Sequence, residues 1–280
     1  MNLYLACPTR ELGQGGRMKE NWNKENMKLF LAAPMINKDL TIHNKYYDNS
    51  IDLADVCVLE SYHYIFNQDW MFPLFKQFKS FLLDSGAFTF MTSQKGKKVD
   101  WQQYVISYGK FVKQHDIELF FELDIDSIVG LPEVERLRNI LETEAGRKCI
   151  PVWHKSRGLE YWNKMVKNYD YVAIGGIVTQ EINRSQYDVF LPLLKTARQN
   201  KCKVHGLGFT NLKGMEKYKF YSVDSTSWLS GNKFGAIYLF NGKTMIKQSK
   251  QSGQRVLTGQ VAIHNFKEWV KFAKYAEKFL

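Results

Sequence analysis

Acidic residues follow several short apolar runs of this sequence. Asp84 ends the run SFLLD, Asp124 and Asp126 lie at the end of IELFFELDID, and Asp224 ends FYSVD. A single aspartate in such a position could equally well be a helix cap or the partner in a surface ion pair. Several carboxylates around one pocket suit glycosyl transfer, in which one attacks the anomeric carbon and another handles the proton of the leaving group.

Further polar or glycine positions follow other apolar runs: His154, Gly175, Gly176 and His205. Asp124 and Asp126 are two residues apart, so a strand would point both to the same side, and the sequence leaves open which one works in the site. The chain has no phosphate-binding glycine loop, no His-x-x-x-His metal pair and no Gly-x-Ser-x-Gly elbow. These absences exclude several common nucleotide, metalloprotease and hydrolase sites.

The elements that must position these residues alternate between strands and helices. The strand-like runs cover residues 28–33, 55–61, 80–86, 117–126, 149–153, 171–176, 203–209 and 220–225. Amphipathic stretches such as 100–115 and 186–200 separate them and have helical length and period. Eight such units predict a closed (β/α)8 TIM barrel, whose active site lies where the strands end; a doubly wound open sheet is the alternative.

Two segments depart from this alternation. Residues 234–247 alternate around Asn241-Gly242, which predicts a β-hairpin inserted after the eighth strand. In residues 264–280, Asn265 and Glu268 have capping-box spacing and predict a closing helix. We therefore expect one domain over 1–280, with an extension at 1–27, a barrel core at 28–228, the hairpin insertion at 229–262 and the helix at 263–280.

The net charge of +11 is unevenly distributed. Residues 191–220 carry seven Lys or Arg against Glu216, and residues 243–280 carry eight against Glu268 and Glu277. Such segments favour a polyanionic partner, of which nucleic acid is the commonest, although a lysine-rich solvated face has the same composition. The expected phosphate contacts are Lys195, Arg198, Lys201, Lys203, Lys267, Lys271, Lys274 and Lys278.

The four cysteines, Cys7, Cys57, Cys149 and Cys202, are widely scattered. No pair has the spacing of a zinc site, so we expect reduced thiols and no bound metal. The N-terminus does not resemble a signal peptide, and the apolar runs are too short to cross a membrane. We therefore expect a cytoplasmic protein.

The motifs LLDSGAF, LDI, AIGGI, GLG and VDSTS occur in this order along the expected barrel. In this arrangement the chain resembles the tRNA-guanine transglycosylases and their phage-encoded DNA-modifying relatives, over roughly residues 28–228. The resemblance implies exchange of guanine in nucleic acid for a free 7-deazaguanine such as 7-cyano-7-deazaguanine, without a cofactor. It makes Asp224 the nucleophile and Asp84 the general acid and base.

The same resemblance implies a base pocket. Ser85 and Phe88 would line it, Asp124 would accept hydrogen bonds from the guanine N1–H and exocyclic amine, and Gly176 would offer its backbone N–H. The remaining expected substrate contacts are His154, Gly175 and His205. Where the family usually has a second glycine and a glutamine in its first motif, this chain has Ala87 and Thr89, and His154 replaces a base-reading glutamine.

The tRNA enzymes carry a zinc module of three cysteines and a histidine after the nucleophile, whereas no cysteine follows Cys202 here. This difference favours the phage-type enzymes, which act on a base flipped out of DNA. A tRNA-directed enzyme without zinc is the alternative in the same class. An inactive barrel that only binds nucleic acid is the alternative from another class.

Overall fold

The computed structural model describes residues 27–33, 52–87, 89, 99–209, 211–230, 235–248 and 258–280. Eight parallel strands form one sheet in the order β4-β3-β2-β1-β8-β7-β6-β5. The strands are β1 (Lys28–Ala32), β2 (Cys57–Ser61), β3 (Ser80–Asp84), β4 (Leu119–Phe120), β5 (Val152–Trp153), β6 (Tyr171–Ile174), β7 (Lys203–Gly206) and β8 (Ser222–Ser225). Each lies within one of the eight apolar runs, so the predicted strand count is confirmed.

The two ends of the sheet meet between β4 and β5. A parallel bridge joins Phe121 to Ile150, and the Ile150 N–H donates to the Phe120 carbonyl at 2.8 Å. The Glu122 N–H then donates to the Ile150 carbonyl at 3.1 Å. The sheet is therefore a closed (β/α)8 barrel, and the open doubly wound alternative is wrong.

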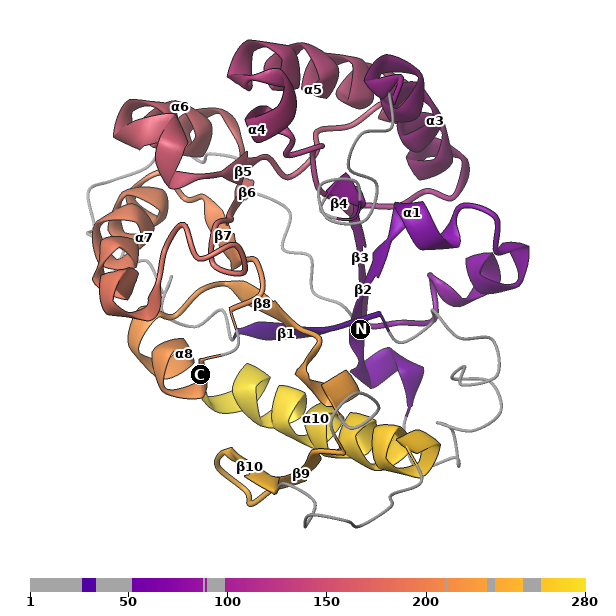
Figure 1. Cartoon of the computed structure of the whole chain (residues 1–280), viewed down its shortest axis with the longest axis vertical. Coiled ribbons are helices and arrows are strands. Elements are labelled where there is room, and N and C mark those ends of the chain that lie inside the picture. Colours follow the sequence, from indigo (N-terminus) through magenta and orange to yellow (C-terminus); the bar gives the residue numbers. More distant parts are fainter. Residues whose placement is uncertain are drawn as a thin grey trace, which may run out of the picture.

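Helices form the outer ring around the strands (Figure 1). They are α1 (Tyr62–Ile65), α3 (Trp101–Gln114), α4 (Asp126–Val129), α5 (Leu131–Ala145), α6 (Gly158–Asn168), α7 (Phe190–Gln199), α8 (Leu212–Tyr218) and α10 (Thr258–Phe279). Short 3-10 segments cover Leu53–Asp55, Asp69–Leu74, Lys155–Arg157, Arg184–Val189 and Ser227–Leu229. The connection between β7 and β8 contains the helix α8.

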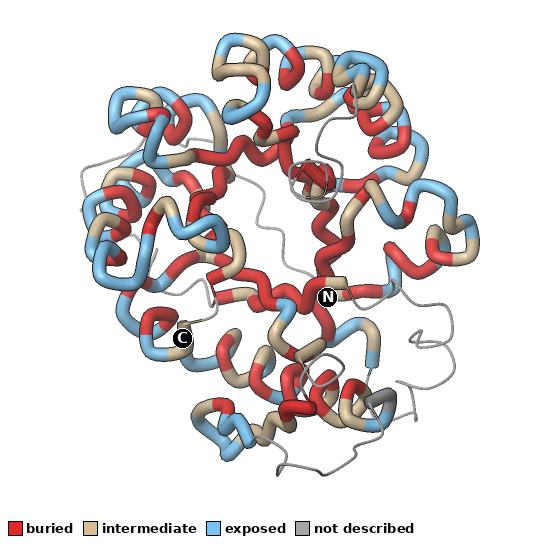
Figure 2. Tube along the Cα trace, viewed as in Figure 1, coloured by how far each residue is buried: buried red, intermediate tan, exposed pale blue. Residues whose placement is uncertain are grey.

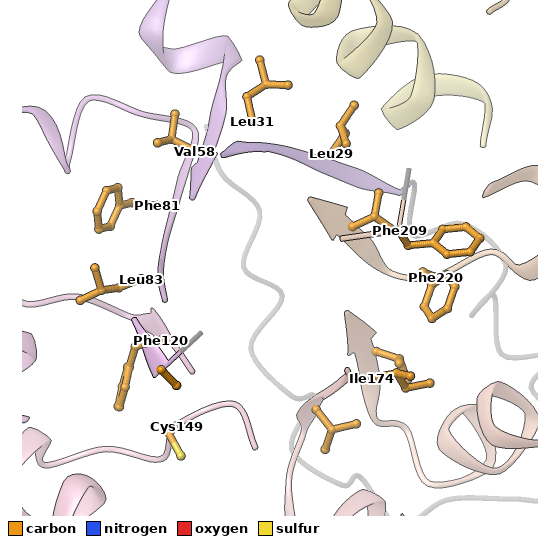
Figure 3. Close-up of a cluster of buried hydrophobic side chains, with 14 of the residues drawn as sticks. Leu29, Leu31, Val58, Phe81, Leu83, Phe120, Cys149, Ile174, Phe209 and Phe220 are labelled. Atoms are coloured by element: carbon orange, nitrogen blue, oxygen red, sulfur yellow. The ribbon is translucent and has the colours of Figure 1, made fainter. Parts of the chain in front are cut away.

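Side chains of the strands alternate between two apolar cores. One core lies between the sheet and the helices, where Leu29, Leu31 and Val58 point away from the barrel interior (Figure 3). The other fills the interior and includes Phe30, Phe121 and seven further buried residues. Because both faces of each strand are covered, the strands are almost wholly buried (Figure 2), which explains their continuous apolar runs.

The predicted hairpin consists of β9 (Ile237–Phe240) and β10 (Met245–Gln248), which pair antiparallel, and β9 lies against α10 (Figure 1). The helix begins at Thr258, ahead of the predicted range of 263–280, and the predicted capping box at Asn265 and Glu268 is wrong. Asn265 is fully buried inside the helix, where its Oδ1 accepts from the Tyr238 N–H at 2.8 Å and its Nδ2 donates to the Ala236 carbonyl at 2.9 Å. Its amide therefore fixes the hairpin to the helix instead of capping it.

Candidate active site

Asp84 is the last residue of β3 and lies at the edge of the barrel where the strands end. Burial raises the pKa of its carboxyl from 3.8 to about 7, and the negative charges of Asp124 and, to a smaller extent, Asp224 act in the same direction. The Gly86 N–H, which donates to Asp84 Oδ2 at 3.0 Å, and the Ser61 hydroxyl oppose the shift. The three carboxylates expected to work together are thus close enough to interact electrostatically.

Asp224 lies in β8 and is buried. Its Oδ1 accepts the Gly208 N–H at 2.6 Å and contacts His205 Nε2 at 3.1 Å. Gly208 has φ of +66°, and a Cβ there would stand 2.4 Å from Cγ2 of Val178. Glycine is therefore required at this turn, which brings a backbone N–H to the carboxylate.

Asp124 belongs to a chain of three polar side chains. Its Oδ2 contacts His154 Nε2 at 3.1 Å, and His154 Nδ1 contacts Glu181 Oε2 at 3.1 Å. Burial opposes protonation of His154, but the hydrogen bond and charge of Asp124 outweigh it, so the pKa of the imidazole is raised. Nothing in the sequence pattern singled out Glu181, because it lies in a loop seven residues after β6.

The two glycines after β6 make room for this chain. A Cβ on Gly175 would stand 2.6 Å from Cε1 of His154, and a Cβ on Gly176 would stand 2.8 Å from Oε2 of Glu181. Gly176 also has φ of +80°. The structure thus gives these glycines a role in seating His154 and Glu181, in addition to the expected role of Gly176 toward a base.

Asp126 has a different hydrogen-bond partner from Asp124, and the strand from which we expected a common side for the two does not extend to them. β4 ends at Phe120, and Asp126 is the first residue of α4, so strand alternation does not reach either aspartate. Asp126 Oδ2 accepts from Arg157 Nε at 3.0 Å. Burial opposes its ionisation, but the hydrogen bond and charge of Arg157 outweigh it and lower the pKa. Asp124 is therefore the better candidate of the pair.

Arg157 is also part of a buried ion cluster that sequence reasoning missed. Its NH1 donates to Glu122 Oε1 at 2.8 Å, and Arg138 donates from Nε to Glu122 Oε2. Glu122 Oε1 also accepts the Val152 N–H at 2.7 Å, next to the β4–β5 closure. Glu122 has no exposed surface, so removal of either arginine would leave a buried charge poorly compensated. This cluster is structural.

Two predicted substrate contacts have no exposed surface. Ser85 is fully buried, and its Oγ accepts the Ala87 N–H at 3.4 Å, while its carbonyl accepts from the Tyr104 hydroxyl at 2.6 Å. His205 is fully buried in the barrel interior and contacts Asp224. In this structure neither residue has exposed surface, and the expected contacts of both with the substrate stay predictions. Phe88 lies outside the described residues.

Three of the expected phosphate contacts, Arg198, Lys203 and Lys274, lie toward the end of the barrel where the strands begin. Arg198 donates to the carbonyls of Tyr218 and Lys219, shortly before β8 begins, and Lys203 is the first residue of β7. Lys274 pairs with Asp55, which precedes β2. The structure therefore does not bring these parts of the two basic segments to the carboxylates. On α10, Lys271, Lys274 and Lys278 are exposed.

Among the residues with described positions, no group of three or more His, Cys, Asp or Glu side chains is placed to hold a metal ion. Cys57, Cys149 and Cys202 are buried free thiols, and burial raises the pKa of Cys57 to about 12. Cys7 lies outside the described residues. In the same parts of the chain, every helix is too short or too polar to cross a membrane.

No family model and no curated protein matches this chain. Solved structures do resemble it. A protein from Coccidioides immitis assigned as a fructose-1,6-biphosphate aldolase matches with a TM-score of 0.53 and 9% identity over 91% of both chains. The tryptophan synthase alpha-subunit of Pyrococcus furiosus matches with a TM-score of 0.44 and 14% identity, over 74% of this chain and 89% of its own. At such identities the likeness to the aldolase supports the barrel fold alone.

Proposed function

We propose that this protein is a base-exchange transglycosylase, which replaces guanine in DNA with a 7-deazaguanine through a covalent aspartyl-glycosyl intermediate. The observation that carries the proposal is the meeting of Asp84, Asp124 and Asp224 at one end of the barrel. The pKa of Asp84 is raised to about 7, partly by the charges of the other two. Carboxyl groups in such different environments can serve as acid and nucleophile at the same pH.

In the first half of the reaction, an oxygen of Asp224 attacks C1′ of the nucleotide as the C1′–N9 bond breaks. Protonated Asp84 donates its proton to the departing guanine. In the second half, Asp84 takes the N9 proton of the incoming 7-deazaguanine, whose N9 then displaces Asp224 from C1′. A carboxyl with a pKa of about 7 is suited to both directions of proton transfer at neutral pH.

Asp124 recognises the base in this scheme. A carboxylate accepts several hydrogen bonds, so Asp124 can accept from His154 and still accept from the guanine N1–H and amine. Glu181 holds His154 from the other side at 3.1 Å. Adenine lacks this pair of adjacent donors, and we expect it to be rejected.

The test is incubation of the purified protein with labelled 7-deazaguanine and either duplex DNA or tRNA. We expect label in DNA, and none with Asp224→Asn. Asp170→Asn is a matched control, because Asp170 is exposed and precedes β6 at the other end of the barrel. Label in tRNA alone would establish the tRNA-directed alternative. Salt-dependent binding of nucleic acid without incorporation into either substrate would contradict the proposal and favour an inactive barrel.

A further inference from the structure

A row of hydrogen-bonded side chains crosses the barrel interior beneath Asp224. His205 Nε2 lies 3.1 Å from Asp224 Oδ1, and His205 Nδ1 contacts the Ser222 hydroxyl. The Ser222 hydroxyl in turn contacts the Tyr171 hydroxyl. Tyr171 is the first residue of β6, so the row runs from the edge where strands begin to the edge where they end.

Strand pairing accounts for this row. His205 and Ser222 are register partners on β7 and β8, so their side chains lie side by side in the interior. Both are fully buried. The rings of Phe30 and Phe121 flank the imidazole, with centroids 6.0 and 5.2 Å from its own. In such apolar surroundings a polar side chain is retained only with hydrogen-bond partners, and the row supplies them.

The contact with Asp224 determines which imidazole nitrogen carries a proton. In the proposed reaction Asp224 attacks as a carboxylate, which only accepts hydrogen bonds, so this role requires the proton on Nε2 of His205. The Gly208 N–H donates to the same oxygen, Oδ1. Both hydrogen bonds that Asp224 accepts from described residues therefore end on Oδ1.

We propose that His205 is a positioning residue, which with Gly208 fixes Asp224 so that Oδ2 is the oxygen that attacks C1′. This inference rests on the proposed function. The two donors hold the carboxylate in one rotamer, while Oδ2 stays free to form the bond. Ser222 and Tyr171 keep the imidazole in the required orientation. Reactive groups held in one geometry react faster than groups that must first be oriented.

The kinetic test uses two substitutions of His205 and single-turnover formation of the covalent adduct with DNA. His205→Leu removes the donor, and we expect adduct formation to slow by about 10- to 100-fold, because the carboxylate is no longer held in the attacking geometry. The KM for the free base should change by less than about threefold, because this base meets Asp124. His205→Gln offers an amide donor near the position of Nε2, so it should restore most of the rate. Equal rates for His205→Leu and the parent would overturn the inference.

A second test does not depend on activity or on a folded His205 variant. In the parent protein labelled with 15N-histidine, NMR should show His205 protonated on Nε2, with an N–H that exchanges slowly with solvent. Asp224→Asn should shift this resonance, and Ser222→Ala should alter the Nδ1 signal. An unprotonated Nε2 would refute the inference whatever the enzyme does. If Nε2 is protonated but the protein exchanges no base, the hydrogen bond from His205 to Asp224 would stand and the proposed function would be refuted.

Discussion

Replacing Asp84 by asparagine should stabilise the protein at high pH. Asparagine has nearly the same shape, and its side-chain carbonyl can still accept the Gly86 N–H that now reaches Asp84 Oδ2. It has no charge to be buried near Asp124 and Asp224, whose charges raise the pKa of Asp84. The substitution therefore removes an unfavourable charge and keeps the local hydrogen bond.

The size and sign of the effect follow from the pKa of Asp84. Between its ordinary pKa of 3.8 and about 7, the folded protein binds a proton that the unfolded chain has lost. The free energy of unfolding of the parent thus falls as pH rises through this window. The difference between 3.8 and about 7, at about 1.4 kcal/mol for each pKa unit, corresponds to about 4 kcal/mol as an upper value. Because Asp84 is partly exposed, solvent screening should reduce this value.

Urea denaturation of the parent and of Asp84→Asn at pH 5, 6, 7 and 8 measures the effect. We expect the stability advantage of the variant to grow by about 1–3 kcal/mol from pH 5 to pH 8. Asp126→Asn is the matched control with the opposite sign. It removes the partner of Arg157, whose side chain is only 1% exposed, and should destabilise the protein at neutral pH.

A pH-independent difference between the parent and Asp84→Asn would refute the reasoning, because it would mean that Asp84 titrates alike in the folded and unfolded chain. Greater stability of Asp126→Asn at neutral pH would contradict the account of the Arg157 ion pair.

Three further predictions concern recognition, metal and docking. Asp124→Ala should reduce base exchange by at least 100-fold with little change in DNA affinity, whereas Asp126→Ala should mainly lower the melting temperature; exchange assays, DNA titrations and melting curves separate the two. Treatment with a chelator should leave exchange activity unchanged, and a loss restored by added zinc would refute a metal-free reaction. If the α10 lysines bind phosphates, their replacement by glutamine should flatten the dependence of log Kd on log salt by up to about 0.9 for each phosphate that is no longer neutralised. An unchanged slope would mean that these lysines only face solvent. They are Lys267, Lys271, Lys274 and Lys278.

The sequence was most informative where local signals and burial agree. Strands covered on both faces consist of continuous apolar runs, and all eight were predicted from them. The Asn241-Gly242 turn identified the hairpin for the same reason, because a local conformational demand selects these residues. Asp84 and Asp224 were found because each ends such a run.

Long-range contacts explain the errors. Asn265 and Glu268 have the spacing of a helix cap, yet their side chains satisfy the Tyr238 and Phe240 N–H groups of β9. Nothing within a few residues of Asn265 reveals that requirement. Glu181 was missed because its partner His154 is 27 residues away and the loop that contains Glu181 has no diagnostic pattern. The positive charge of residues 191–220 and 243–280 did not indicate at which end of the barrel these segments lie.

The central claim is that Asp224 forms a covalent bond to the sugar, and mass spectrometry tests it most directly. The protein should be mixed with DNA, quenched in denaturant before the incoming base is added, and digested with protease and nuclease. We predict a deoxyribosyl mass on the peptide that contains Asp224, absent in Asp224→Asn and present at reduced amount in Asp84→Asn. Base exchange without any adduct, or an adduct on a peptide that lacks Asp224, would contradict the account.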